Sequence, residues 1–81
     1  MTVHVRFFSI LHDIFRRAEL EIHLKESLPA RDVFLNLFGD RSLGDRLLPS
    51  IRFAINSEYV PSETPVQDGD ELACIPPVSG G

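Results

Sequence analysis

Residues 66–81, VQDGDELACIPPVSGG, hold one short strand between two signals that end regular structure. Asp68-Gly69 is a strong turn signal, because both residue types tolerate the backbone angles of tight turns. The apolar run ELACI that follows predicts the last β-strand of the chain. Pro76 and Pro77 then end the sheet, since proline has no N–H to donate to a neighbouring strand. The stretch therefore predicts a strand that leads directly into an extended tail.

The predicted tail, residues 76–81, combines a stiff base with a tip that has no side chains. The diproline favours polyproline II, an extended conformation with little entropy left to lose. Gly80 and Gly81 can follow almost any backbone path and are narrow. A tail of this length reaches about 20 Å, which suits threading the α-carboxyl of Gly81 into a channel of another protein. A frayed chain end explains a terminal Gly-Gly equally well, so the tail alone leaves both interpretations open.

Upstream of this stretch, three segments alternate between apolar and polar residues, which is typical of half-buried strands. They cover residues 3–7, 19–24 and 51–55, and a short strand is expected before the final one. The first two strands and the last two are expected to form antiparallel pairs. Residues 9–18 are predicted to be a connection with one helical turn, and residues 40–50 a polar connection.

Between residues 27 and 39 the apolar spacing becomes helical. The side chains that share one helical stripe are Val33, Phe34, Leu37 and Phe38. Pro29 suits the first turn, because its missing N–H would have no partner there. One main helix packed across a sheet of four to five strands predicts a two-layer α+β fold.

The composition narrows the classes of function. A chain of 81 residues forms one small domain. A net charge of −4 argues against a partner that is held through phosphates, so neither nucleic acid nor a membrane surface is expected. No stretch approaches the roughly 20 apolar residues that cross a bilayer. The single cysteine cannot form an internal disulfide, which favours a cytoplasmic location.

The side chains offer little other chemistry. Cys74 lies within an apolar strand and is expected to be a small buried residue rather than a sulfur-handling thiol. His4, His12 and His23 lack the paired spacing of metal ligands, so no metal site is predicted. None of these side chains is a stronger candidate than the tail, whose two interpretations stay open.

The same C-terminal stretch resembles the MoaD/ThiS family of ubiquitin-like sulfur carriers, and most closely the MoaD branch of molybdopterin synthase small subunits. The positions that match the family pattern are Val66, Gly69, Asp70, Glu71 and all of residues 76–81. Residues 5–15 look like the family's first strand and the loop after it, and residues 53–60 look like a later segment. The resemblance implies a ubiquitin-like β-grasp fold with a mixed sheet, a domain over 1–75 and a tail over 76–81. It also implies that the first and last strands lie side by side in the middle.

The resemblance further implies that Gly81 is adenylated by a ubiquitin-activating-type, MoeB-like enzyme. ATP and magnesium would be bound there, and this chain would bind no cofactor. The adenylate would become a thiocarboxylate and donate sulfur to cyclic pyranopterin monophosphate. That step would take place in a MoaE-like large subunit, within a heterotetramer of two small and two large subunits. The chain alone is expected to be non-catalytic.

Three alternatives stay open. Gly81 could be joined to a lysine of another protein, as in ubiquitin-like modifiers. The chain could carry sulfur for thiamin, cysteine or the tungsten cofactor, although PPVSGG favours the molybdopterin branch over thiamin carriers. It could also be a binding module whose Gly-Gly is inert.

The resemblance also implies a set of partner-binding residues beside the reactive Gly80-Gly81. They are Phe7, Tyr59, Ile75, Pro76, Pro77, Val78 and Ser79. Phe7 and Ile75 could instead be core residues on adjacent strands, and Ser79 a solvated spacer. Tyr59 is the better interface candidate, because it lies in an irregular segment.

Overall fold

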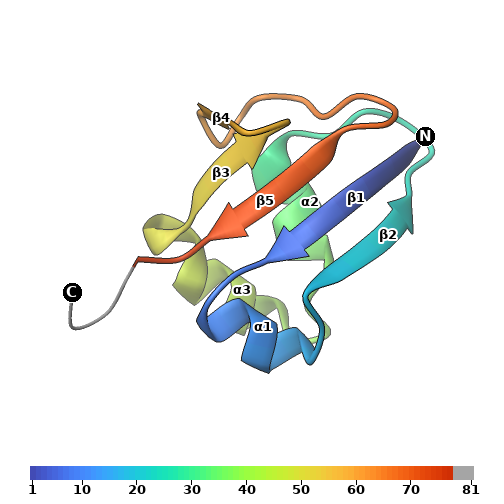
Figure 1. The fold of residues 1–81 in the computed structure, drawn as a ribbon. Coiled ribbons are helices and arrows are strands. Elements are labelled where there is room, and N and C mark those ends of the chain that lie inside the picture. The colour runs from blue at the N-terminus through green and yellow to red at the C-terminus, as the bar shows by residue number, and fades with distance from the viewer. Residues whose placement is uncertain (78–81) are drawn as a thin grey trace.

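Five strands form one mixed sheet in the computed structural model, which describes residues 1–77. They are β1 (Thr2–Phe7), β2 (Glu19–His23), β3 (Arg52–Ile55), β4 (Glu58–Val60) and β5 (Glu71–Ile75). Their order across the sheet is β2-β1-β5-β3-β4. Figure 1 shows β1 and β5 side by side at the centre, which confirms the placement of the first and last strands.

The pairing directions confirm one expectation and correct another. β1 pairs antiparallel with β2, as predicted, and parallel with β5. β3 lies between β5 and β4 and pairs antiparallel with both. The last two strands along the chain, β4 and β5, are therefore not partners, because β3 separates them. This mixed sheet with helices packed across one face is the ubiquitin-like β-grasp arrangement.

The helices of the described chain are α1 (Ile10–Phe15), α2 (Ala30–Asn36), α3 (Arg41–Leu47) and the 3-10 helix η1 (Leu48–Ser50). Figure 1 shows α2 behind the sheet, with α1 and α3 near the end where β1 and β5 stop. The predicted main helix is α2, preceded by Pro29, and the predicted helical turn after β1 is α1. None of the helices within residues 1–77 is long and apolar enough to span a bilayer.

The polar connection predicted for residues 40–50 is wrong, because this segment forms α3 and η1. Asp40 caps α3, since its side chain accepts a hydrogen bond from the Ser42 backbone N–H at 3.0 Å. Gly44 lets α3 approach the end of α2 closely. A Cβ atom at Gly44 would lie 2.8 Å from Cδ2 of Phe38. The helix is thus capped at its start and packs closely against the end of α2.

The core lies between the sheet and the helices. Its buried residues include Val3, Val5 and Phe7 of β1, Phe34 of α2, Phe53 of β3, and Leu72 and Cys74 of β5. Five phenylalanine rings form a continuous series through it, with centroid distances of 4.4 Å (Phe7–Phe15), 4.9 Å (Phe15–Phe38), 5.0 Å (Phe38–Phe34) and 5.8 Å (Phe34–Phe53). The alternation predicted for β1 is confirmed by this burial.

Polar side chains fix the end of the sheet where β5 begins. Asn56 accepts a hydrogen bond from the Glu71 N–H at 3.0 Å and donates one to Asp70 at 3.0 Å. Asp68 accepts from the Thr2 N–H at 2.7 Å. Gly69 has φ +85°, which confirms the predicted turn. We call residues 56–57 and 67–70 the turn end of the sheet.

Candidate partner-binding site at the base of the tail

At the opposite end of the sheet, β5 leads into Pro76 and Pro77. Pro76 is buried against the domain, and Pro77 is exposed. Both line a hollow of about 240 Å³ whose other walls are Ser9, Ile10, Leu47, Ser50 and Ile51. We call this cavity the tail-base hollow, and the end of the sheet around it the tail end. The first residue of the predicted tail is therefore packed into the folded domain.

Two apolar side chains near this hollow face solvent. Phe8 is 39% exposed and Ile10 is 51% exposed, whereas Phe7 and Leu11 on either side are buried. Between them Ser9 has φ 54° and ψ −130°, a combination that residues other than glycine rarely adopt. This corner turns the chain from β1 into α1. The exposure of Phe8 has a signal in the sequence, because the alternation of β1 puts Phe8 on the face opposite Phe7.

Phe7 does not belong to a contact surface, and the partner-binding role predicted for it is wrong. Its side chain is only 3% exposed. Its ring stacks on Phe15, with centroids 4.4 Å apart. The alternative interpretation, that Phe7 is a core residue, is the correct one.

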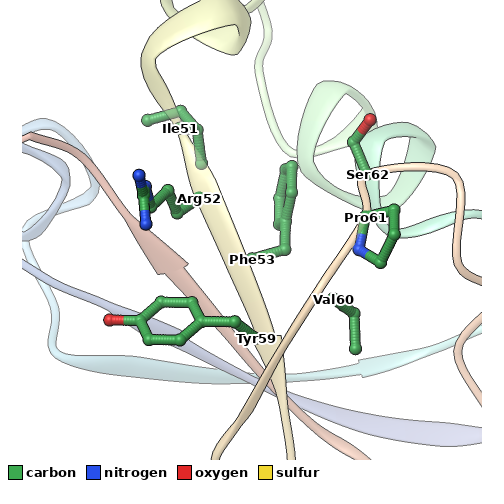
Figure 2. A pocket seen from close by; sticks show the side chains of 7 residues that line it. All are labelled: Ile51, Arg52, Phe53, Tyr59, Val60, Pro61 and Ser62. Atoms are coloured by element: carbon green, nitrogen blue, oxygen red, sulfur yellow. The ribbon is translucent and has the colours of Figure 1, made fainter.

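Tyr59 and Ile75 lie on either side of Arg52. In the sheet register Arg52 is directly opposite Ile75, which is half-buried. Tyr59 is 68% exposed, and the Arg52 guanidinium carbon lies 6.0 Å from its ring centroid. Figure 2 shows the side chains of Arg52 and Tyr59 beside a second hollow, whose volume is about 480 Å³. Its lining residues are Ile51, Arg52, Phe53, Tyr59, Val60, Pro61 and Ser62.

Cys74 is buried on β5 with its side chain in the core, which confirms the interpretation as a small buried residue. Burial raises the pKa of its thiol to about 12. The thiol is therefore protonated at neutral pH and shielded from reagents, so it is unsuited to act as a nucleophile.

Two of the three histidines lie near the carboxylate of Glu21. His4 is opposite Glu21 in the β1–β2 pair, and His23 lies two residues further along β2. Nδ1 of His4 lies 3.8 Å from Glu21, and Nε2 of His23 lies 3.5 Å from it. All three side chains are more than half exposed. Over residues 1–77, no three His, Cys, Asp or Glu side chains are placed to share a metal ion. The predictions for Val78, Ser79, Gly80 and Gly81 fall outside the described residues.

Comparison with known proteins identifies relatives over nearly the whole chain. A family model described as the ThiS family matches residues 5–81. The molybdopterin synthase sulfur carrier subunit of Pyrenophora tritici-repentis is 39% identical over 66 residues, which are 73% of this chain and 70% of that protein. The protein of the same name from Drosophila erecta is 32% identical over 87 residues, covering 100% of this chain and 92% of the relative.

Solved structures share the fold. SAMP1 from Haloferax volcanii superposes with a TM-score of 0.81 at 24% identity, with both chains fully covered. The small archaeal modifier protein 1 of Methanosarcina acetivorans gives 0.75 at 26% identity, over 99% of this chain and 96% of that one. A chain from the complex of subunits 1 and 2 of the molybdopterin-converting factor of Helicobacter pylori gives 0.62 at 26% identity, with full coverage of both chains.

Proposed function

Because the chain belongs to the ThiS family, we propose that it is a sulfur carrier of molybdopterin synthesis, with the α-carboxyl of Gly81 as its working group. The observation that carries this proposal is the position of PPVSGG. The motif follows directly on the central strand β5, and its first residue, Pro76, is buried in the domain. Relatives that carry the name of molybdopterin synthase sulfur carrier subunit support it.

The proposed chemistry activates a carboxylate that is otherwise a poor electrophile. A carboxylate oxygen of Gly81 attacks the α-phosphorus of ATP, and pyrophosphate leaves. Hydrosulfide then attacks the acyl carbon of the adenylate and displaces AMP, which leaves a thiocarboxylate and one proton. ATP and magnesium would be bound by a ubiquitin-activating-type, MoeB-like enzyme rather than by this chain. The buried, protonated Cys74 supports the choice of the terminal carboxyl as the sulfur-bearing group.

In the second half of the proposal, the thiocarboxylate donates its sulfur to cyclic pyranopterin monophosphate inside a MoaE-like large subunit. This chain would then be the small subunit of molybdopterin synthase, non-catalytic alone, in a heterotetramer of two small and two large subunits. The similar Helicobacter pylori chain was solved in a complex of subunits 1 and 2, which supports a partner of this kind. A cytoplasmic location is part of the same proposal.

We assign partner contacts to residues at the base of the tail and, from the family resemblance, to the tail itself. They are Tyr59, Ile75, Pro76 and Pro77, followed by Val78, Ser79 and Gly80 next to Gly81. Phe8 replaces Phe7 in this set, because Phe8 is 39% exposed and Phe7 is 3% exposed.

Mass spectrometry tests the proposal directly. The purified chain is incubated with ATP, magnesium, the activating enzyme and sulfide, and its intact mass is measured. The expected result is exchange of one oxygen for one sulfur, confined to Gly81 in the sequenced C-terminal fragment. Fragment sequencing is needed because this exchange nearly matches the mass of an added oxygen on Met1 or Cys74.

Two variants control the measurement. Cys74→Ala removes the only thiol and should retain the mass change. Deletion of Gly81 should abolish it. A mass change that disappears in Cys74→Ala, or no change with an activating enzyme of proven competence, would overturn the proposal.

A second candidate function is protein modification, favoured by the similarity to the small archaeal modifier protein 1 of Methanosarcina acetivorans. In that case Gly81 forms an isopeptide bond with a lysine of a target protein. A search for Gly-Gly remnants on lysines, in cells that express a protease-cleavable variant of the chain, separates the two functions. Sulfur carriage alone leaves no such remnants.

A further inference from the structure

We infer that the tail-base hollow is a docking pocket for one apolar side chain of the second subunit, at the mouth of the channel that receives the tail. This inference rests on the proposed function and adds contacts to Ser9, Ile10, Leu47, Ser50 and Ile51, which lie outside the tail. The pocket would position the tail before sulfur transfer. Loss of the pocket would therefore weaken association with the second subunit without changing the chemistry of Gly81.

The lining of the hollow selects an apolar occupant. Charged residues make up 25% of the chain, yet the residues within 1–77 that line this hollow are all uncharged. Its walls are three aliphatic side chains, two prolines and two serines. A charged side chain placed there would lose its hydration without gaining an ionic partner.

The size of the hollow selects a single side chain. Its volume of about 240 Å³ is below the roughly 300–1,000 Å³ that is usual for small-molecule sites. One large aliphatic or aromatic side chain is a suitable occupant. Such an anchor in a pocket at the centre of an interface is typical of residues that dominate binding energy.

The walls of the hollow are already in place in the free chain. Ser9 holds a strained backbone conformation (φ 54°, ψ −130°) at the start of α1, and Leu11 behind it is fully buried. Ile10 is therefore kept at the surface, 51% exposed, instead of folding into the core. A pocket that exists before binding avoids the entropy cost of forming it, and strain of this kind is concentrated at functional sites.

The length of the tail limits how far the partner can lie from this hollow. Residues 78–81 extend at most about 13 Å beyond Pro77. Any surface that encloses the carboxyl of Gly81 must come within that distance of Pro77. A channel deep and narrow enough to exclude water around the carboxyl therefore brings its mouth onto Pro77, which is itself a wall of the hollow.

Two substitutions on exposed positions test the pocket in opposite ways. Ser50→Trp fills the hollow without removing a wall, and Ile10→Ser removes an apolar wall. Gln67→Trp is the matched control, because Gln67 is also uncharged and exposed but lies at the turn end. Each variant is checked for thermal unfolding and for thiocarboxylate formation. The dissociation constant for the second subunit is then measured by isothermal titration calorimetry.

The expected result is about tenfold weaker binding or more for Ser50→Trp and Ile10→Ser, with Gln67→Trp unchanged. All three should unfold at the unmodified temperature and form the thiocarboxylate normally. Unchanged affinity in both pocket variants would overturn the inference while leaving the proposed function intact. Slower adenylation of the pocket variants with unchanged affinity for the second subunit would assign the hollow to the activating enzyme. That result would also overturn the inference. Failure of the unmodified chain to form a thiocarboxylate would overturn the proposed function itself.

Discussion

The two ends of β5 are built from different kinds of contact. At the turn end, the side chains of Asn56, Asp68 and Asp70 form hydrogen bonds of 2.7–3.0 Å. These bonds connect the loops 56–57 and 67–70 to each other, to β1 and to β5. At the tail end, the surface around Pro76 and Pro77 is apolar and contains a hollow. One end pairs its polar side chains within the domain, and the other leaves apolar surface that the proposed second subunit would cover.

This difference separates stability from function along one strand. Hydrogen bonds at the turn end fix the register of β5 between β1 and β3. Apolar surface at the tail end adds little to the stability of the free chain while it stays exposed. We therefore expect substitutions that remove a hydrogen-bonding side chain at the turn end to change the free energy of unfolding, and substitutions at the tail end to change binding and activation.

The largest expected effect is at the tail end. Deletion of Gly80 and Gly81 should abolish thiocarboxylate formation completely, because the chain loses the backbone that reaches the activating enzyme. The unfolding temperature should stay the same, since the deletion lies beyond the sheet and its core. Mass spectrometry and a thermal melt on the same sample measure both. A deletion variant that is still activated, or that melts clearly earlier, would contradict the separation of the two ends.

Asn56→Ala should give the largest effect at the turn end. The substitution removes two hydrogen bonds of 3.0 Å each, to Glu71 and Asp70. It also places alanine at φ 52°, a left-handed conformation that asparagine tolerates better. We expect a loss of about 2–3 kcal/mol in the free energy of unfolding by urea denaturation. Affinity of the folded variant for the second subunit should be unchanged.

Gly44→Ala tests the helix that supports the tail end. Its new Cβ would lie 2.8 Å from the Phe38 ring, which destabilises by overpacking, while alanine favours the helix by about 1 kcal/mol over glycine. We expect a net loss of about 1 kcal/mol in urea denaturation. Gly39→Ala is the control, because a Cβ there meets nothing within 4 Å. A Gly44→Ala variant about 1 kcal/mol more stable than Gly39→Ala would show that Phe38 moves aside freely, because only Gly44 lies in a helix.

Ser57→Gly should stabilise the chain slightly. Asn56 and Ser57 form the two-residue loop between β3 and β4, with φ values of 52° and 73°. Glycine adopts such angles without steric cost, and Asn-Gly is the preferred pair in this kind of hairpin. We expect a gain of about 0.5 kcal/mol in the free energy of unfolding. A loss of stability would mean that the serine side chain makes a contribution that its backbone angle does not reveal.

The smallest effect concerns Asp40 at the start of α3. Hydrogen bonds from the Ser42 side chain and backbone lower the pKa of Asp40 below its ordinary value of 3.8. Because the folded-state pKa is the lower one, the stabilisation is present above 3.8 and is lost as the pH falls through the folded-state pKa. Asp40→Ala should therefore melt slightly earlier than the unmodified chain near neutral pH. The two melting temperatures should converge in strong acid.

Strands were predictable from the sequence because their signals are local. Alternation identified β1 and β2, and the flanking turn and prolines bounded β5. The central position of β5 is a non-local property, and it came from the family resemblance rather than from periodicity. Helix α3 was missed although it has seven residues, as α2 does. It is capped by Asp40 and packs closely against Phe38 at Gly44, a contact that only the fold brings together.

The candidate site was predictable only in part. The partner-binding role expected for Phe7 came from the family resemblance and not from the strand pattern. Alternation with Val3 and Val5 already placed Phe7 in the core and left Phe8 outside. The tail-base hollow was not predictable, because its walls come from separate parts of the chain around residues 9–10, 47–51 and 76–77.

The parallel pairing of β1 with β5 also governs when the protein can fold. These two strands come from opposite ends of the chain, so the centre of the sheet stays incomplete until residues 71–75 have been synthesised. Contacts between such distant segments slow folding, and the open edges of β1 and β3 are prone to aggregation meanwhile. Translation that stops before β5 leaves the sheet in two separate pairs, β1 with β2 and β3 with β4. Such a chain would also lack the carboxyl of Gly81 that the proposed function requires.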